Sequence, residues 1–166
     1  PEEAEDLGRH PSLVVSDTDL MDCEQFALGT YSPLTGFMDR QTLDSVLGEY
    51  RLPDGNVWTM PLVLQVDAAS INGFAAGDRV LLKSAGGLEH SLLDVTEIYT
   101  FERSAIARNW FGTDSAKHPG VSRFMQDGGT FIAGEVTLIS RLPSEFRHYE
   151  LSPAQSRSIF THKGWS

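Results

Sequence analysis

Ten residues in the first quarter of the chain read Gly29-Thr30-Tyr31-Ser32-Pro33-Leu34-Thr35-Gly36-Phe37-Met38. Two glycines and a proline in so short a stretch oppose a helix, and solvated linkers are rarely this aromatic. The composition therefore predicts a rigid, packed loop. The side chains expected to anchor it are the large apolar ones: Tyr31, Leu34, Phe37 and Met38.

A helix is predicted on each side of this loop. The run Ser16-Asp17-Thr18-Asp19 predicts a helix start, since Ser caps helices and acidic groups favour the helix N-terminus. Apolar residues then recur at helical spacing as far as Gly29, which ends the element. The second helix is predicted to begin near Asp39 and to stop before Gly48. Its expected buried residues are Leu43, Val46 and Leu47.

Strand signals dominate the middle of the chain, over residues 57–66, 79–83, 88–101 and 130–139. Pro61 indicates that the first of these strands is an edge or carries a bulge. Simple alternation along the third strand predicts one shared face for Leu93, Val95, Glu97 and Tyr99. Shorter helices are expected at 102–110, 122–126 and from 153 to about 163. This pattern predicts an α+β, strand-rich fold, a small barrel-like sheet decorated with short helices.

The length and composition of the chain limit which classes of function it can have. A chain of 166 residues is most simply one domain, and its net charge of −10 argues against binding a nucleic-acid backbone as the main activity. No apolar run approaches the roughly 20 residues needed to span a bilayer. Cys23 is the only cysteine, so an internal disulfide is excluded, and the composition fits a reducing cytoplasm.

Both ends of the chain suggest a piece of a longer protein. Residues 1–11 form an acidic lead-in that we expect to be mobile, followed by a domain over 12–163. Ser152-Pro153 predicts the capped start of a last helix, which Gly164 ends. Residues 164–166 are then expected to begin a linker, because a helix that closes in Gly-Trp normally leads into further structure.

Few residues suggest a catalytic or ligand-binding role. His118 stands in a loop rich in Gly and Pro, where a buried or capping role competes with a catalytic one. The acidic run Asp17, Asp19, Asp22 and Glu24 is interpreted as a solvated helix face rather than a cation site. Cys23 lies on the apolar side of the same helix and is interpreted as core. The five histidines lack metal-ligand spacing. The bare pairs Gly86-Gly87 and Gly128-Gly129 each precede a predicted strand and are interpreted as hairpin-type turns rather than phosphate loops.

The opening stretch resembles the Gly-x-x-Ser-Pro-Leu-x-Gly-Phe-Met signature of the ATP sulfurylase (sulfate adenylyltransferase) family. Further matches follow in the family's order over about residues 12–165. They are Leu52-Pro53-Asp54-Gly55, Gly77-Asp78-Arg79-Val80-Leu81-Leu82, Val95-Thr96-Glu97-Ile98-Tyr99, Phe111-Gly112-Thr113, His118-Pro119-Gly120-Val121, Gly134, Leu151-Ser152-Pro153-Ala154-Gln155-Ser156-Arg157 and Gly164-Trp165. Single motifs are weak, but their shared order is specific.

The resemblance implies a PUA-like pseudobarrel, the N-terminal region of enzymes that join ATP and sulfate into adenosine 5′-phosphosulfate and pyrophosphate. Magnesium accompanies the nucleotide in that reaction. The family's Gln-Thr-Arg-Asn-Pro, His-x-x-His and Gly-Arg-Asp-His-type motifs belong to the following catalytic domain and do not occur in this sequence. We therefore carry over no catalytic, cofactor-binding or metal residue, and expect this chain alone to be inactive.

The expected role is structural, packing against the catalytic domain and, in a homo-oligomer, against a neighbouring subunit. Candidate interface residues are Tyr31, Phe37, His118, Phe160 and Trp165. For Tyr31, Phe160 and Trp165, two roles remain open: the ring lies at an interface, or it completes this domain's own core. The alternatives are a free-standing PUA-like module that binds RNA or protein, which the acidic charge opposes, and a separate regulatory subunit.

Overall fold

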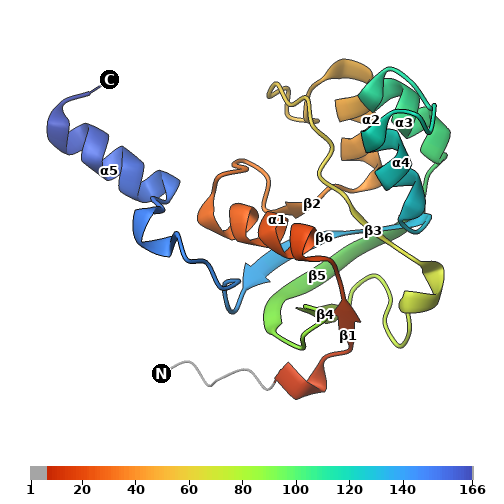
Figure 1. The fold of residues 1–166 in the computed structure, drawn as a ribbon, viewed down its shortest axis with the longest axis horizontal. Coiled ribbons are helices and arrows are strands. Elements are labelled where there is room, and N and C mark those ends of the chain that lie inside the picture. Colours follow the sequence, from red (N-terminus) through yellow and green to blue (C-terminus); the bar gives the residue numbers. More distant parts are fainter. Residues whose placement is uncertain (1–6, 166) are drawn as a thin grey trace.

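A computed structural model describes residues 7–165, which form one six-stranded mixed sheet with helices on both sides (Figure 1). The strand order is β1-β4-β5-β6-β2, and β3 pairs with β6 beside β2. All pairs are antiparallel except β1 with β4. The predicted α+β, strand-rich class is confirmed. The strands are β1 (Ser12–Val14), β2 (Gly36–Phe37), β3 (Leu64–Val66), β4 (Arg79–Lys83), β5 (Glu89–Thr100) and β6 (Thr130–Leu138).

Five α-helices and three short 3-10 turns complete the chain. The α-helices are α1 (Asp17–Leu28), α2 (Arg40–Glu49), α3 (Arg103–Phe111), α4 (Pro119–Gln126) and α5 (Pro153–Lys163). The 3-10 turns are Leu7–Arg9, Ala68–Ser70 and Arg147–Tyr149. Residues 1–6 of the predicted lead-in lie outside the described residues. Within residues 7–165, no helix combines the length and the apolar character needed to cross a bilayer.

Local capping explains where the helices begin. Ser16 forms a capping box with Asp19 at the start of α1, and Gly29 adopts the left-handed conformation that ends it, so both predicted boundaries are confirmed. The predicted end of α2 before Gly48 is wrong. The helix runs through Gly48 to Glu49, and Tyr50 takes the left-handed position at φ 54° although it is not glycine.

Two other boundaries differ from the predictions. The predicted strand 57–66 is reduced to β3 at its end, while Val57 forms only an isolated bridge with Arg51. Pro61 lies between these two pieces, and a residue without an N–H cannot continue a ladder. The helical turn predicted at 122–126 begins earlier, at Pro119, because His118 caps α4 by accepting a hydrogen bond from Val121 N at 3.4 Å.

The long strand β5 does not alternate simply. Val95 pairs with Gly134 and Glu97 pairs with Ala133, so Thr96 is an extra residue in a β-bulge. The bulge reverses which side of the sheet the following side chains face. Ile98, and not Tyr99, therefore shares a core with Leu93 and Val95, and the predicted common face for all four alternate residues is wrong.

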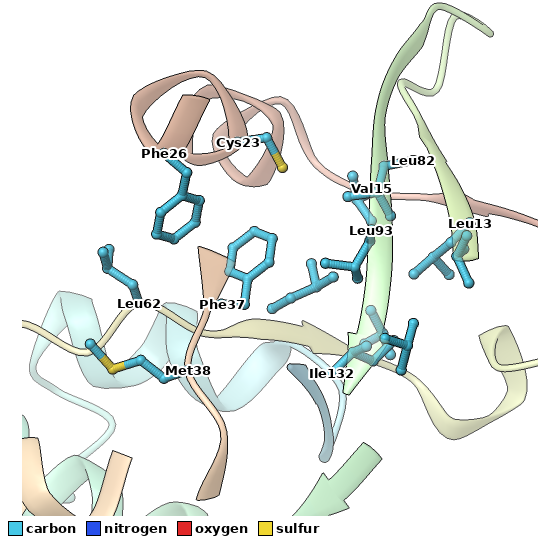
Figure 2. Close-up of a cluster of buried hydrophobic side chains, with 14 of the residues drawn as sticks. Leu13, Val15, Cys23, Phe26, Phe37, Met38, Leu62, Leu82, Leu93 and Ile132 are labelled. Atoms are coloured by element: carbon cyan, nitrogen blue, oxygen red, sulfur yellow. The ribbon is translucent and has the colours of Figure 1, made fainter. Parts of the chain in front are cut away.

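The sheet consequently serves two hydrophobic cores. The barrel core lies between α1 and the strands, and Figure 2 shows Leu13, Val15, Cys23, Phe26, Phe37, Met38, Leu62, Leu82, Leu93 and Ile132 within it. The helical core lies where α2, α3 and α4 gather at one end of the sheet (Figure 1). Its buried members are Leu43, Leu47, Tyr99, Ile106, Ala107, Val121, Phe124, Phe131 and Ala133.

The loop between α1 and α2 is packed as predicted. Phe37 is 4% exposed, and its ring meets that of Phe26 edge-on with centroids 5.2 Å apart. Tyr31 and Leu34 pack against the same barrel core while remaining partly exposed. Gly36 lies directly against the backbone of Gly134 in β6, where an added Cβ would stand 1.9 Å from the Gly134 carbonyl oxygen. Close packing of two backbones therefore requires glycine here.

Candidate functional site

The feature with the strongest functional signal is the C-terminal arm, residues 139–165, which continues from β6 and carries α5 away from the sheet (Figure 1). Among the described residues, twelve large apolar side chains are exposed, and seven of them lie in the arm. Exposed apolar surface on this scale is typical of an interaction surface. The seven are Ile139, Phe146, Tyr149, Leu151, Ile159, Phe160 and Trp165.

A single carboxylate fixes the root of the arm to the domain. Glu24 on α1 accepts hydrogen bonds from Arg141 Nε at 2.5 Å and from Leu142 N at 2.6 Å. Arg141 in turn reaches Glu150 at 2.7 Å, and Ser144 donates to that same carboxylate. The arm therefore leaves the sheet in a defined direction.

Glu24 corrects one prediction. The acidic run of α1 was expected to be a solvated face, but Glu24 is only 5% exposed. Burial by itself raises the pKa of this carboxyl, and the hydrogen bonds from Arg141 and Leu142 outweigh that effect and lower the pKa below its usual range. The partner residue lies 117 positions away in the sequence, so helical spacing could not reveal it.

His90 lies beside the contact between Glu24 and the arm, and the sequence analysis did not identify it as a site residue. It is fully buried on β5, its Nδ1 is 2.5 Å from Ser91 Oγ, and its carbonyl accepts hydrogen bonds from Ile139 N and Ser140 N. Its Nε2 is 3.6 Å from Glu24 Oε1, which is too long for a hydrogen bond. Burial lowers the pKa of His90, although Glu24 opposes the shift, so the ring is neutral at pH 7.

A groove of about 1100 Å³ separates α1 from the arm. Its apolar lining includes Met21 and Leu28 of α1 and Phe146 and Leu151 of the arm. The carboxylate of Asp17 lies at the groove as well. The groove can accept an apolar helix or loop whose flank is basic.

The helix α5 is well capped but unsupported. Ser152 and Gln155 form a capping box, and Gly164 ends the helix in the left-handed conformation. No α5 side chain is buried by the rest of the described chain, residues 7–165. The Phe160 and Trp165 rings lie 5.8 Å apart, and Lys163 Nζ is 5.2 Å from the Trp165 ring.

The predicted interface residues do not form one cluster. Phe160 and Trp165 lie together on the arm, with 46% and 60% of their surfaces exposed. Phe37 is buried in the barrel core, and Tyr31 packs beside it while donating a hydrogen bond from its hydroxyl to Asp22 at 2.9 Å. His118 caps α4 on the helical side of the sheet.

A second cleft, of about 560 Å³, lies between the N-terminal end of α1 and α4. Asp19 and Asp127 line it, and Arg123 crosses it to donate a hydrogen bond to Thr18 Oγ1 at 3.1 Å. Burial, with a smaller contribution from Asp127, raises the pKa of Asp19. Among the described residues, His, Cys, Asp and Glu form no cluster of three or more that could hold a metal ion.

Cys23 lies in the core, as predicted. Its side chain is fully buried, and burial raises the pKa of its thiol to about 12. A thiol in this state is a poor nucleophile at neutral pH.

Comparison with known proteins places these features in a wider context. A profile of the PUA-like domain family matches residues 2–141. Sulfate adenylyltransferases from Symbiobacterium thermophilum, Synechococcus sp. and Pyrococcus abyssi are 35%, 37% and 36% identical to the chain. The alignments cover 99%, 99% and 94% of this chain but only 42%, 43% and 40% of those proteins. The chain thus spans about two fifths of the length of the relatives it matches.

A solved structure described as a hexameric APS kinase from Thiobacillus denitrificans has a similar fold. It superposes with a TM-score of 0.69 at 25% sequence identity. The superposition covers 96% of this chain and 27% of that one. The similarity therefore includes most of the sheet and helices described above but a minor part of the larger protein.

Proposed function

The chain belongs to the PUA-like domain family, and from that premise we propose that it is the non-catalytic N-terminal domain of a sulfate adenylyltransferase. The observation that carries the proposal is the match of nearly the whole chain to about two fifths of several such enzymes. The enzyme that contains this domain makes adenosine 5′-phosphosulfate and pyrophosphate from ATP and sulfate.

The chemistry of that reaction explains why the domain is not the catalyst. Attack of a sulfate oxygen on the α-phosphorus of ATP brings several negative charges together. The transition state requires cationic side chains, backbone donors and a metal directed at those oxygens. A domain with a net charge of −10 is a poor source of that field. Magnesium and ATP therefore bind to the remainder of the enzyme, and no step passes through the residues of this domain.

The contribution of this domain is packing. The arm places seven exposed apolar side chains and α5 beyond the sheet, which is where a following domain or a neighbouring subunit can cover them. In this interpretation residues 12–163 are the domain and 164–166 begin the connection to the catalytic domain. We infer that the enzyme is a homo-oligomer, because the similar solved structure is described as hexameric. A cytoplasmic location is in keeping with a chain whose single cysteine is free and buried.

Two measurements test the proposal. Purified residues 1–166 should release no pyrophosphate from MgATP in the presence of sulfate, while the longer protein encoded by the same gene should do so. Sulfate-dependent turnover by residues 1–166 would sink the non-catalytic assignment. A stop codon directly after Ser166 would instead favour a separate regulatory subunit, and a salt-sensitive gel shift with RNA would favour a nucleic-acid module.

A further inference from the structure

The cleft between α1 and α4 lies at the boundary of the two hydrophobic cores. Val15 and Val66 in its lining belong to the barrel core, and Phe124 belongs to the helical core. The lining residues all fall between Val14 and Gly128, so the cleft is formed by the sheet and its helices and not by the arm. Its volume of about 560 Å³ is typical of a small-molecule site, since such sites measure roughly 300–1,000 Å³.

Part of the lining is apolar and closely packed. The Trp110 ring meets that of Phe124 edge-on with centroids 5.9 Å apart, and it stacks on Phe111 at 4.5 Å. Gly128 lies so close to β3 that an added Cβ would stand 2.0 Å from the carbonyl oxygen of Val66. These contacts fix the shape of the cavity, so it can bury the hydrocarbon part of a ligand without first rearranging.

The charged side chains of the cleft are mostly acidic. Four aspartates line it, and Arg123 is the one cation among the lining residues, which leaves an excess of three negative charges. The aspartates come from different elements: Asp19 and Asp22 lie on α1, Asp67 follows β3 and Asp127 follows α4. Within the described residues 7–165, the carboxylates of Asp67 and Asp127 have no hydrogen-bond or ion-pair partner.

Burial makes this excess of negative charge unfavourable. It raises the pKa of Asp19, and it also raises the pKa of Asp22, although the hydrogen bond from the Tyr31 hydroxyl opposes that shift. A cation nearby stabilises the ionised carboxylates. The helix α4 also ends at the cleft, and the C-terminal end of a helix favours positive charge. The cleft therefore repels anions such as ATP and sulfate and suits a positively charged ligand.

Arg123 shows how a cation fits into this cavity. Its guanidinium reaches from α4 to α1, where it donates a hydrogen bond to Thr18 Oγ1 at 3.1 Å, and its charge favours the ionised form of Asp19. One apolar stem with a cationic head is thus long enough to cross the cleft. A ligand of similar length with a cation at each end can reach carboxylates on both helices.

We propose that this cleft binds a linear aliphatic diamine in its doubly protonated form, with one ammonium group at Asp19 and the other at Asp127. The hydrocarbon stem packs against the Trp110 and Phe124 rings, and each ammonium donates charge-assisted hydrogen bonds to its carboxylate. Arg123 is a like charge in the same cavity and limits the affinity. This site goes beyond the proposed function, because it takes a cation and uses none of the residues of the arm.

Isothermal titration calorimetry of purified residues 1–166 with 1,5-diaminopentane tests the site. The stem of this diamine is about as long as that of an arginine side chain. The titration is run at about 0.15 M salt, which screens weak attraction to exposed carboxylates elsewhere on the chain. We expect saturable binding of one diamine per chain. Pentylamine, which carries a single ammonium group, should bind roughly tenfold more weakly or worse.

Four substitutions separate this site from general attraction to an acidic surface. Asp127→Asn should weaken binding roughly tenfold, and the fold should survive because the side chain is exposed. Asp19→Asn should act similarly, since its amide oxygen can still accept the capping hydrogen bond from Ser16. Arg123→Gln should tighten binding roughly threefold by removing a like charge. Asp44→Asn is the matched control, because it removes the same charge from α2, outside the cleft, and should bind as the wild type does.

Three results would overturn the proposal. Absence of saturable binding to the wild-type chain would exclude the site. Equal losses of affinity in Asp127→Asn and Asp44→Asn would mean that the diamine is attracted to the acidic surface as a whole. An unchanged or weakened affinity in Arg123→Gln would place the diamine away from this guanidinium. None of these results touches the pyrophosphate assay, so the non-catalytic assignment stands or falls separately.

Discussion

His90 and Glu24 meet at the point where the arm joins the domain, and their protonation states make stability depend on pH. Burial holds the pKa of His90 below its ordinary value of 6.5. As pH falls below 6.5, the unfolded chain therefore takes up a proton that the folded chain resists, and stability falls. The pKa of Glu24 is also lowered, so its contribution is present above 4.5 and is lost only at more acidic pH.

We expect the urea midpoint of the wild-type chain to drop between pH 7.5 and about pH 5.5. In His90→Gln, which keeps a polar side chain but does not titrate, the drop in this interval should be smaller. Equal pH dependence in the two proteins would show that His90 is not the source.

Phe37 illustrates how a single ring supports the packed loop. It is 4% exposed and contacts Phe26 edge-on, so Phe37→Ala should destabilise the fold by roughly 3–5 kcal/mol in urea unfolding. Tyr31→Ala should cost less, about 1–3 kcal/mol, because the Tyr31 ring is only partly buried. Val57→Ala is the control, since Val57 is 65% exposed and its truncation should stay within about 0.5 kcal/mol. A near-neutral Phe37→Ala would contradict the packed-loop interpretation.

At the scale of elements, two glycines should respond to alanine with opposite signs. An added Cβ at Gly36 would lie 1.9 Å from the carbonyl oxygen of Gly134, so Gly36→Ala must separate β2 from β6. We expect a loss of about 3 kcal/mol or more.

Gly48 lies inside α2, and a Cβ added to it would have no heavy atom within 4 Å beyond its own helix backbone and chain neighbours. Gly48→Ala should therefore raise stability by about 0.5–1 kcal/mol. Thermal unfolding of the Gly36→Ala and Gly48→Ala variants measures both effects. A stabilised Gly36→Ala chain would contradict the described contact between β2 and β6.

The helix boundaries show which structural features can be predicted from the sequence. Ser16, Gly29 and Ser152 act on neighbours within a few residues, and the helix boundaries they predict are confirmed. Tyr50 was missed because it is not a glycine, yet it takes the left-handed conformation that ends α2, and its carbonyl accepts a hydrogen bond from Trp58 N at 2.9 Å.

The candidate site was also hard to predict from the sequence, because its contacts join residues that are far apart in the chain. Phe160 and Trp165 are exposed in the described chain, and their role at an interface stays a prediction. The joint between Glu24 and Arg141 links residues 117 positions apart. Secondary-structure propensity and residue spacing depend on residues that are close in the sequence, so they cannot predict this pairing. Only the folded structure shows it.

For the whole molecule, hydrogen exchange should separate the sheet from the arm. β5 and β6 form the centre of the sheet and join both cores, so their amides should exchange only through global unfolding. The α5 amides should exchange far faster, because α5 buries no side chain against the rest of residues 7–165. Protection of α5 equal to that of β5 and β6 would contradict the description of α5 as uncovered by the rest of residues 7–165.

The bulge at Thr96 has a consequence for how this chain can change in length. β5 serves both cores only because Thr96 takes no pairing partner on β6 between Val95 and Glu97. Removing that one residue would turn Ile98 toward the helices and Tyr99 toward the barrel, exchanging the occupants of both cores at once. We therefore expect surface loops to tolerate insertions and deletions, whereas the interval from Val95 to Tyr99 should keep its residue count even where its side chains are replaced.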